Sequence, residues 1–110
     1  SRALIMSWRG EEGGIAAANA GNDVVMTPNA SVYFDHYQDR LYEPLAIAGL
    51  TDLSEVYYYQ PIPKNMKTGR EHVLGAQAQL WTEYIVGNKQ LEYMIFPRLI
   101  ALAEVLWTAE

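Results

Sequence analysis

Two pairs of an aromatic and a carboxylate residue, each spaced by two positions, are candidates for chemistry. Trp81 precedes Glu83 in one pair, and Tyr33 precedes Asp35 in the other. In an extended chain, side chains two residues apart point to the same face, so each pair would place an aromatic ring beside a carboxylate. Such a pair suits a sugar, because the apolar CH face of the sugar stacks on the ring and its hydroxyl groups donate to the carboxylate.

Trp8 adds a third aromatic residue at the end of an apolar run, residues 3–8. The C-terminal ends of strands are where barrels and open sheets form their active sites. Taken alone, each pair has a plainer explanation: an indole in the core, a solvated glutamate, a tyrosine that packs at a rim, an aspartate in a turn or cap. Three strand ends that each carry an aromatic residue make coincidence a weaker explanation.

Other chemistries find little support in the sequence. His36 and His72 are too few for a three-histidine metal site, and we expect each to make an ordinary polar contact. Cysteine is absent, the glycines near residue 10 lack a Walker lysine and dinucleotide spacing, and no G-x-S-x-G elbow occurs. The sequence therefore predicts neither a metal nor a cofactor.

The elements that position these residues follow from the hydrophobic pattern. Residues 3–8 form a nearly continuous apolar run, and residues 23–26 form another, as in strands covered on both faces. Between them, Glu11 and Glu12 suit a helix N-terminus and Gly21 suits a left-handed C-cap. Strand, helix and strand predict a βαβ unit with parallel strands, so the fold class is α/β.

The remaining sequence predicts a long irregular segment, one more strand and a helix. Residues 27–71 are punctuated by Pro and Gly, with one short helix after Thr51. Residues 72–81 alternate strictly, which predicts a strand with an apolar face of Leu74, Ala76, Ala78 and Leu80 and a second face of Gln77, Gln79 and Trp81. A helix is expected over residues 91–107, restarted at Pro97, with an apolar stripe of Phe96, Leu99, Ile100, Ala103, Leu106 and Trp107.

Composition and length exclude several partners. The 110 residues are 50% apolar, as in a globular domain, and the net charge of −5 repels phosphate backbones, so nucleic acid is not expected. Arg98 and Glu104 interrupt the longest apolar stretch, well short of the roughly 20 residues of a membrane span, so no membrane partner is expected. Three strands are too few to close a barrel, and we expect a fragment of one domain, residues 1–110, with no second domain.

Six motifs, in this order and spacing, resemble the C-terminal part of a glycoside hydrolase family 20 catalytic domain, the family of the β-N-acetylhexosaminidases. They are SWRG (7–10), DVVMTP (23–28), VYFDHYQ (32–38), EPLAI (43–47), LGAQAQLWTEY (74–84) and FPRLIALAEVLW (96–107). The resemblance implies a (β/α)8 barrel, of which this chain would hold about strands six to eight and the following helices. It also implies a periplasmic, secreted or lysosomal parent protein.

The resemblance implies a role for each candidate residue. Family members remove terminal β-linked N-acetylglucosamine or N-acetylgalactosamine with retention, and the substrate's own acetamido oxygen is the nucleophile. Tyr33 would be the catalytic tyrosine that hydrogen-bonds this oxygen. Trp8 would lie beside the acetamide methyl group and Trp81 under the pyranose ring, while Asp35 and Glu83 would accept from the hydroxyls at sugar positions four and six. The implied substrate is an N-acetylhexosamine-terminated glycan or a chitooligosaccharide.

Two other classes of function remain open from the residues. A non-catalytic carbohydrate-binding module would also display Trp8, Tyr33 and Trp81, and it would saturate with N-acetylglucosamine in a Trp fluorescence titration. A structural or assembly segment would instead pair its exposed sheet edges with another chain, so it would self-associate or swap. A single monomeric peak in light scattering would count against that third class.

The 110 residues alone are expected to have no measurable hexosaminidase activity. The family's adjacent Asp-Glu pair, which orients the acetamide and supplies the general acid, belongs to strand four, and no Asp-Glu dipeptide occurs here. Losing general acid catalysis costs on the order of a hundred- to ten-thousand-fold in rate. Release of p-nitrophenol from p-nitrophenyl N-acetyl-β-glucosaminide by the purified chain would contradict this expectation.

Overall fold

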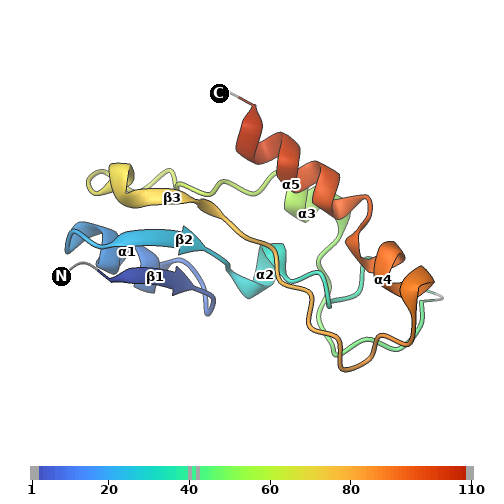
Figure 1. Cartoon of the computed structure of the whole chain (residues 1–110). Helices are drawn as coiled ribbons and strands as arrows, with labels where there is room; N and C mark the ends of the chain where they lie inside the picture. Colours follow the sequence, from blue (N-terminus) through green and yellow to red (C-terminus); the bar gives the residue numbers. More distant parts are fainter. Residues whose placement is uncertain (1–2, 40, 42, 109–110) are drawn as a thin grey trace. The chain divides into compact units, whose positions relative to one another are not determined.

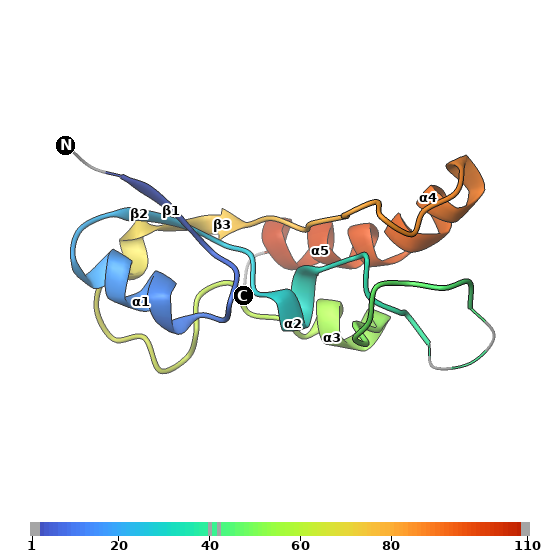
Figure 2. The same ribbon diagram turned by 90° about the horizontal axis from the view of Figure 1, so that it is seen from below.

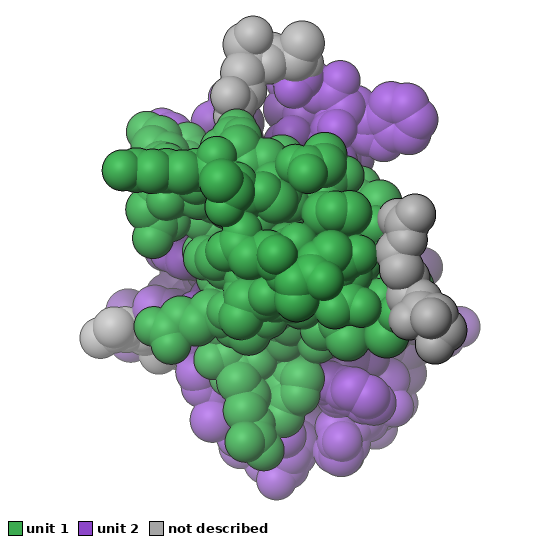
Figure 3. Space-filling view, turned by 90° about the vertical axis from the view of Figure 1, so that its left-hand side faces the viewer, with its two compact units in different colours: residues 1–29, 60–77 green, residues 30–59, 78–110 purple. Residues whose placement is uncertain are grey.

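The computed structural model describes residues 3–39, 41 and 43–108. The chain divides into two compact units, which Figure 3 colours separately: unit 1 comprises residues 1–29 and 60–77, and unit 2 comprises residues 30–59 and 78–110. In chain order the elements are β1 (Leu4–Ser7), α1 (Glu12–Asn19), β2 (Asp23–Met26), α2 (Asn29–Val32), α3 (Leu53–Tyr57), the 3-10 helix η1 (Arg70–His72), β3 (Val73–Ala76), α4 (Asn88–Ile95) and α5 (Arg98–Trp107) (Figure 1).

Unit 1 contains the predicted βαβ unit. Its sheet has the order β1-β2-β3, and both pairings are parallel. Helix α1 packs on β1 and β2 along one face of this sheet (Figure 2). Gly21 ends the helix with a φ of 87°, and its N–H donates to the carbonyl of Ala18, as the sequence predicted. The α/β class is therefore confirmed.

The predicted strand over residues 72–81 is shorter and less regular than its alternation suggests. Strand β3 ends at Ala76, and Leu74 forms a bulge, because Val24 pairs with Val73 while Val25 pairs with Gly75. An extra residue shifts the alternation by one position, so the prediction of one continuous apolar face was wrong. Leu74 is 62% exposed.

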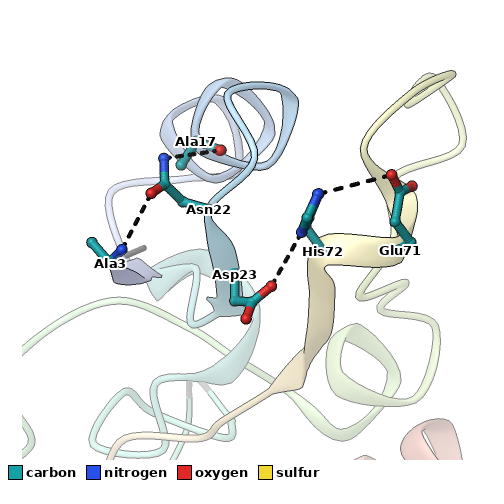
Figure 4. Close-up of polar contacts among 6 residues, drawn as sticks. All are labelled: Ala3, Ala17, Asn22, Asp23, Glu71 and His72. Carbon is teal, nitrogen blue, oxygen red and sulfur yellow. Dashed lines mark hydrogen bonds and ion pairs between the residues drawn. The ribbon is translucent and has the colours of Figure 1, made fainter. Parts of the chain in front are cut away.

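Side chains outside the ladder tie the start of the sheet together. His72 contacts the carboxylate of Asp23 through Nδ1 at 3.1 Å, and the Glu71 carboxylate lies 3.9 Å from its Nε2 (Figure 4). Asn22 accepts from the N–H of Ala3 and donates to the carbonyl of Ala17. His72 thus makes the ordinary polar contact that the sequence predicted.

Ser7 caps α1 from the end of β1. Its hydroxyl accepts from the N–H of Gly14 at 3.0 Å and donates to the carbonyl of Gly10 at 2.7 Å. The first N–H groups of a helix have no partner within the helix, and the Glu11 side chain does not cap α1. Because Ser7 does so instead, the chain segment that carries Trp8 is held against the helix.

In unit 2, α3 and α5 lie side by side (Figure 2), and α4 precedes α5. The expected helix after Thr51 is present as α3, and the restart at Pro97 separates α4 from α5. The predicted apolar stripe of Phe96, Leu99, Ile100, Ala103, Leu106 and Trp107 is exposed. The face of α5 that is buried carries Arg98, Ala101 and Leu102. Apolar residues occur around most of this helix, so the stripe is not the face that packs within the described chain.

Gly14→Ala is expected to destabilise the protein by about 1–3 kcal/mol. A Cβ atom there would lie 2.9 Å from Met26 Sδ and from Ser7 Cβ, a clash that outweighs the gain in helix propensity of about 1 kcal/mol. Gly13→Ala is the matched control, because its Cβ would meet only Ser7 Oγ, at 3.8 Å. Urea denaturation measures both variants, and equal midpoints would contradict the packing described here.

Candidate functional site

Three of the five candidate residues line one small hollow in unit 2. Asp35, Trp81 and Glu83 share it with residues from the loop 45–47, from the segment after Glu83 and from α4. These further lining residues are Leu45, Ala46, Ile47, Tyr84, Ile85, Gln90 and Met94. The hollow therefore combines two carboxylates, an indole and an apolar rim.

A short parallel pairing brings these residues together. Tyr33 pairs with Gln79 in an isolated bridge, in which the Phe34 N–H donates to the Gln79 carbonyl at 2.7 Å and the Gln79 N–H donates to the Val32 carbonyl at 2.9 Å. Asp35 and Trp81 each follow the paired residues by two positions. Segments far apart in the sequence are thus placed in register by two backbone hydrogen bonds.

The structure corrects the local conformation expected around Tyr33. Tyr33 and Asp35 are expected on one face of an extended, alternating segment, but Asn29–Val32 form α2, and the two residues after Tyr33 form a turn. Val32, Phe34 and Asp35 are all buried, so the alternation of faces was wrong. A four-residue helix is too short for hydrophobic periodicity to reveal it.

Asp35 is a buried carboxylate with an open hydrogen-bonding position. It is only 5% exposed, and its Oδ1 has no hydrogen-bond partner among the described residues. Burial raises the pKa of Asp35, the neighbouring charge of Glu83 adds to this rise, and the backbone N–H of Asp35 together with His36 and Arg98 opposes it. Buried polar atoms normally have partners, so a ligand that donates a hydrogen bond would complete this site.

Tyr33 and His36 lie on the same turn. Their ring centroids are 5.7 Å apart with an interplanar angle of 50°. His36 Nδ1 lies 3.0 Å from Thr51 Oγ1, whose hydroxyl donates to the Ala30 carbonyl. Thr51 Oγ1 thus links the His36 ring to the backbone of Ala30. His36 thus makes the ordinary polar contact expected from the sequence.

Trp8 belongs to unit 1, where it follows β1. Trp8 is 45% exposed, and the guanidinium of Arg9 lies 4.8 Å from its ring centroid. It lines a cavity of about 630 Å³ formed by residues 5–13. The convergence of Trp8 with the candidate residues of unit 2 stays a prediction.

Neither a metal-binding cluster nor a membrane-spanning helix occurs among the described residues. Among residues 3–39, 41 and 43–108, no group of three His, Cys, Asp or Glu side chains could hold a metal ion. Within the same residues, no helix is both long and apolar enough to cross a membrane.

Comparison with known proteins identifies the family. The sequence profile of "Glycosyl hydrolase family 20, catalytic domain" matches residues 1–110. The chain is 51% identical to a β-hexosaminidase of Porphyromonas gingivalis over 109 residues, which are 96% of this chain and 14% of the relative. It is 36% identical to a β-hexosaminidase of Vibrio furnissii over 105 residues, 91% of this chain and 17% of that relative.

A solved structure agrees with the sequence matches. The family 20 exo-β-N-acetylglucosaminidase of Vibrio harveyi, solved in complex with N-acetylglucosamine, superposes with a TM-score of 0.81 at 36% identity, covering 97% of this chain and 17% of that one. The chain belongs to glycosyl hydrolase family 20. It spans less than a fifth of the length of these family 20 relatives.

Arg98 is the residue of this family 20 chain that sequence reasoning missed. It was treated only as a charge that interrupts an apolar stretch, whereas the structure buries it completely. Its guanidinium donates to the carbonyls of Phe34, His36, Thr51 and Met94. The sequence did contain one signal: the apolar residues Ala101 and Leu102, one helical turn after Arg98, place the arginine on a buried face of α5.

The charge of Arg98 persists despite its burial. Burial lowers the pKa of Arg98 to about 10, and the nearby charges of Glu43, Asp35 and Tyr93 oppose this lowering. At neutral pH the group is therefore still protonated and all its N–H groups remain donors. The turn that carries Asp35 thus packs on a permanent positive charge.

Asp35→Asn is expected to stabilise the family 20 protein at neutral pH. The pKa of Asp35 is raised above its ordinary value of 3.8 in the folded state, so the native state binds the proton more tightly and stability falls as pH rises through this window. The Asp35→Asn variant has no carboxyl group at this position, so it does not lose this stability as pH rises. Its advantage should be absent below pH 3.8, where the carboxyl is neutral in both states, and complete above the raised pKa.

Urea denaturation at about pH 3 and about pH 7 measures this difference. Asp52→Asn is the control of opposite sign, because hydrogen bonds from the Glu55 N–H and the Ser54 hydroxyl lower the pKa of Asp52. The quantity to compare is the stability of Asp35→Asn minus that of wild type at the same pH. A smaller difference at about pH 7 than at about pH 3 would contradict the burial cost assigned to the carboxylate.

Proposed function

We propose that this chain is the C-terminal part of the catalytic (β/α)8 barrel of a retaining exo-β-N-acetylhexosaminidase. The full-length protein would hydrolyse terminal β-linked N-acetylglucosamine or N-acetylgalactosamine from a glycan or chitooligosaccharide. The names of the relatives support the activity, since both curated proteins are β-hexosaminidases. The Vibrio harveyi enzyme was solved with N-acetylglucosamine bound, which supports the sugar.

The surface of the chain supports its place in a larger barrel. β1, β2 and β3 would be about strands six, seven and eight, and residues 1–110 would all belong to the one catalytic domain. Leu4 and Met6 on β1, and Ile100 and Trp107 on α5, are exposed, and such apolar surface is normally covered by neighbouring structure. The outer edges of β1 and β3, which pair with no described strand, are where further barrel strands would add, and in the isolated chain they favour self-association.

The terminal sugar would lie against the mouth of the unit 2 hollow, whose own volume of about 10 Å³ is too small for a sugar ring. The observation that carries the proposal is that Asp35, Trp81 and Glu83 line this one hollow. Trp81 is 54% exposed, so its ring is available to stack under a pyranose ring. Asp35 and Glu83 would accept from the hydroxyls at positions four and six, and a hydroxyl donor would satisfy the open Oδ1 of Asp35.

Tyr33 and Trp8 would act on the acetamido group. In substrate-assisted catalysis the acetamido oxygen attacks the anomeric carbon while the glycosidic bond breaks, so positive charge spreads into an oxazolinium-like ring. The Tyr33 hydroxyl would donate to this oxygen and hold it in line for attack. Trp8 would pack beside the acetamide methyl group, and water would later open the ring with net retention.

The general acid would come from residues outside this chain. No Asp-Glu pair occurs in the 110 residues, and in the proposed mechanism that pair orients the acetamide and protonates the leaving oxygen. The chain would therefore supply the sugar-holding half of the active site, which is why we expect it to be inactive alone. No metal or cofactor takes part in this mechanism.

Tyr33→Phe in the full-length protein is expected to lower kcat about a hundredfold with little change in KM. The hydroxyl's hydrogen bond matters most as charge develops on the acetamido group, so its loss affects the transition state more than the bound substrate. Steady-state hydrolysis of p-nitrophenyl N-acetyl-β-glucosaminide measures both constants.

Glu83→Gln is the comparison variant for Tyr33→Phe. Glu83 would bind a hydroxyl remote from the reacting bond, so its substitution should raise KM more than it lowers kcat. A rise in KM alone for Tyr33→Phe would remove the role given to Tyr33. An inactive wild-type full-length protein would overturn the proposed function itself.

A further inference from the structure

Arg98 uses every donor of its guanidinium on the protein backbone. Nε and Nη2 donate to the Met94 carbonyl, Nη1 donates to His36 at 3.1 Å and Thr51 at 2.9 Å, and Nη2 also donates to Phe34. A guanidinium has five N–H donors, so none is left over. The ring of Phe34 lies 4.9 Å from the guanidinium carbon, which covers its flat face.

Two of these carbonyls flank Asp35. The Phe34 carbonyl belongs to the peptide bond between Phe34 and Asp35. The His36 carbonyl belongs to the peptide bond between His36 and Tyr37. A planar guanidinium that binds both holds the turn in one orientation. The Phe34 N–H is held in turn by the carbonyl of Gln79 at 2.7 Å, so the turn is fixed from both sides.

Arg98 fixes the turn around Asp35 without binding the Asp35 carboxylate itself. Among the described residues, Arg98 makes no ion pair within 4.0 Å with Asp35 or any other carboxylate. Asp35 Oδ1 is therefore buried near the charge of Arg98 and yet has no hydrogen-bond partner among the described residues. A direct Arg98–Asp35 pair would have filled that position, whereas the backbone contacts leave it open.

We infer that Arg98 is a positioning residue, which orients the Asp35 carboxylate toward a hydroxyl of the bound sugar by clamping the carbonyls on either side of it. This inference rests on the proposed function, because it requires that Asp35 binds substrate. Arg98, on α5, does not line the hollow, so it would affect sugar affinity only through Asp35. The positive charge of Arg98 also helps to keep the carboxylate ionised, the form with the greater capacity to accept.

Lysine cannot replace this clamp. An ammonium group retains the charge but lacks the rigid fork that binds several carbonyls at once. Arg98→Lys in the full-length protein is therefore expected to raise KM for p-nitrophenyl N-acetyl-β-glucosaminide about tenfold, with a smaller change in kcat. Asp35→Asn should raise KM as well, since it removes the acceptor itself.

A double-mutant cycle separates positioning from general stability. If Arg98 acts through Asp35, Arg98→Lys should change KM less than about twofold once Asp35→Asn is present. A merely structural arginine would lower Tm and leave the two effects on KM multiplicative. Arg70→Lys is the matched control, because Arg70 Nη1 donates to the Met66 carbonyl in unit 1, and it should leave KM unchanged.

Each outcome decides between defined alternatives. Non-multiplicative KM effects together with an unchanged Arg70→Lys protein support the inference, and multiplicative effects in an active protein overturn it alone. An inactive wild type overturns the proposed function and the inference with it. If Arg98→Lys does not fold, Phe34→Leu removes the ring against the guanidinium and enters the same cycle, with the same coupling to Asp35→Asn expected.

Discussion

A guanidinium group in a protein core is costly, on the order of several kcal/mol, unless each of its donors finds an acceptor. Arg98 meets this condition with four backbone carbonyls. Three of them, those of Phe34, His36 and Thr51, belong to the segment that joins α2 to α3, whose described residues have little regular structure. Buried backbone needs partners that such a segment cannot supply for itself. Arg98 takes the place of a neighbouring strand, and an irregular turn can therefore lie in the core.

This arrangement explains why a poorly paired carboxylate is retained in unit 2. Asp35 is buried, one of its oxygens lacks a partner among the described residues, and burial raises its pKa. Such a group lowers stability, and sites that violate the rules of good packing are commonly functional. The backbone of the turn is held by Arg98 and Gln79, so the cost falls on the side chain alone. The fixed backbone of the turn also keeps the unpaired Oδ1 of Asp35 in one place.

Elements with strong local signals could be predicted from the sequence. The apolar runs of β1 and β2, the C-cap at Gly21 and the interruption at Pro97 all have causes within a few residues, and each prediction was confirmed. The bulge at Leu74 could not be predicted, because it arises from the register with β2. Helix α2 could not be predicted, because its four residues are too few to show a hydrophobic period.

The candidate site shows the same division between local and long-range causes. Trp81 and Glu83, which the spacing of two residues grouped, both line the hollow, and their binding of a sugar stays a prediction. The argument from alternation failed for Asp35, which nevertheless lines the same hollow because Tyr33 pairs with Gln79. Residue types thus indicated the chemistry, while the pairing that assembles it depends on contacts between distant segments. The burial of Arg98 depends on such contacts as well, since its acceptors lie on the segment between α2 and α3 and on α4.

The loops around the hollow are held by side chains that bind backbone. Gln90 of α4 accepts from the Val86 N–H at 2.8 Å and donates to the Tyr84 carbonyl at 3.1 Å, next to Glu83. Arg98 does the same for the turn that carries Asp35. Backbone groups are present whatever the side chain, so these contacts constrain the path of a loop without constraining its sequence. A scaffold of this kind allows the side chains that line the hollow to change while the loops keep their positions.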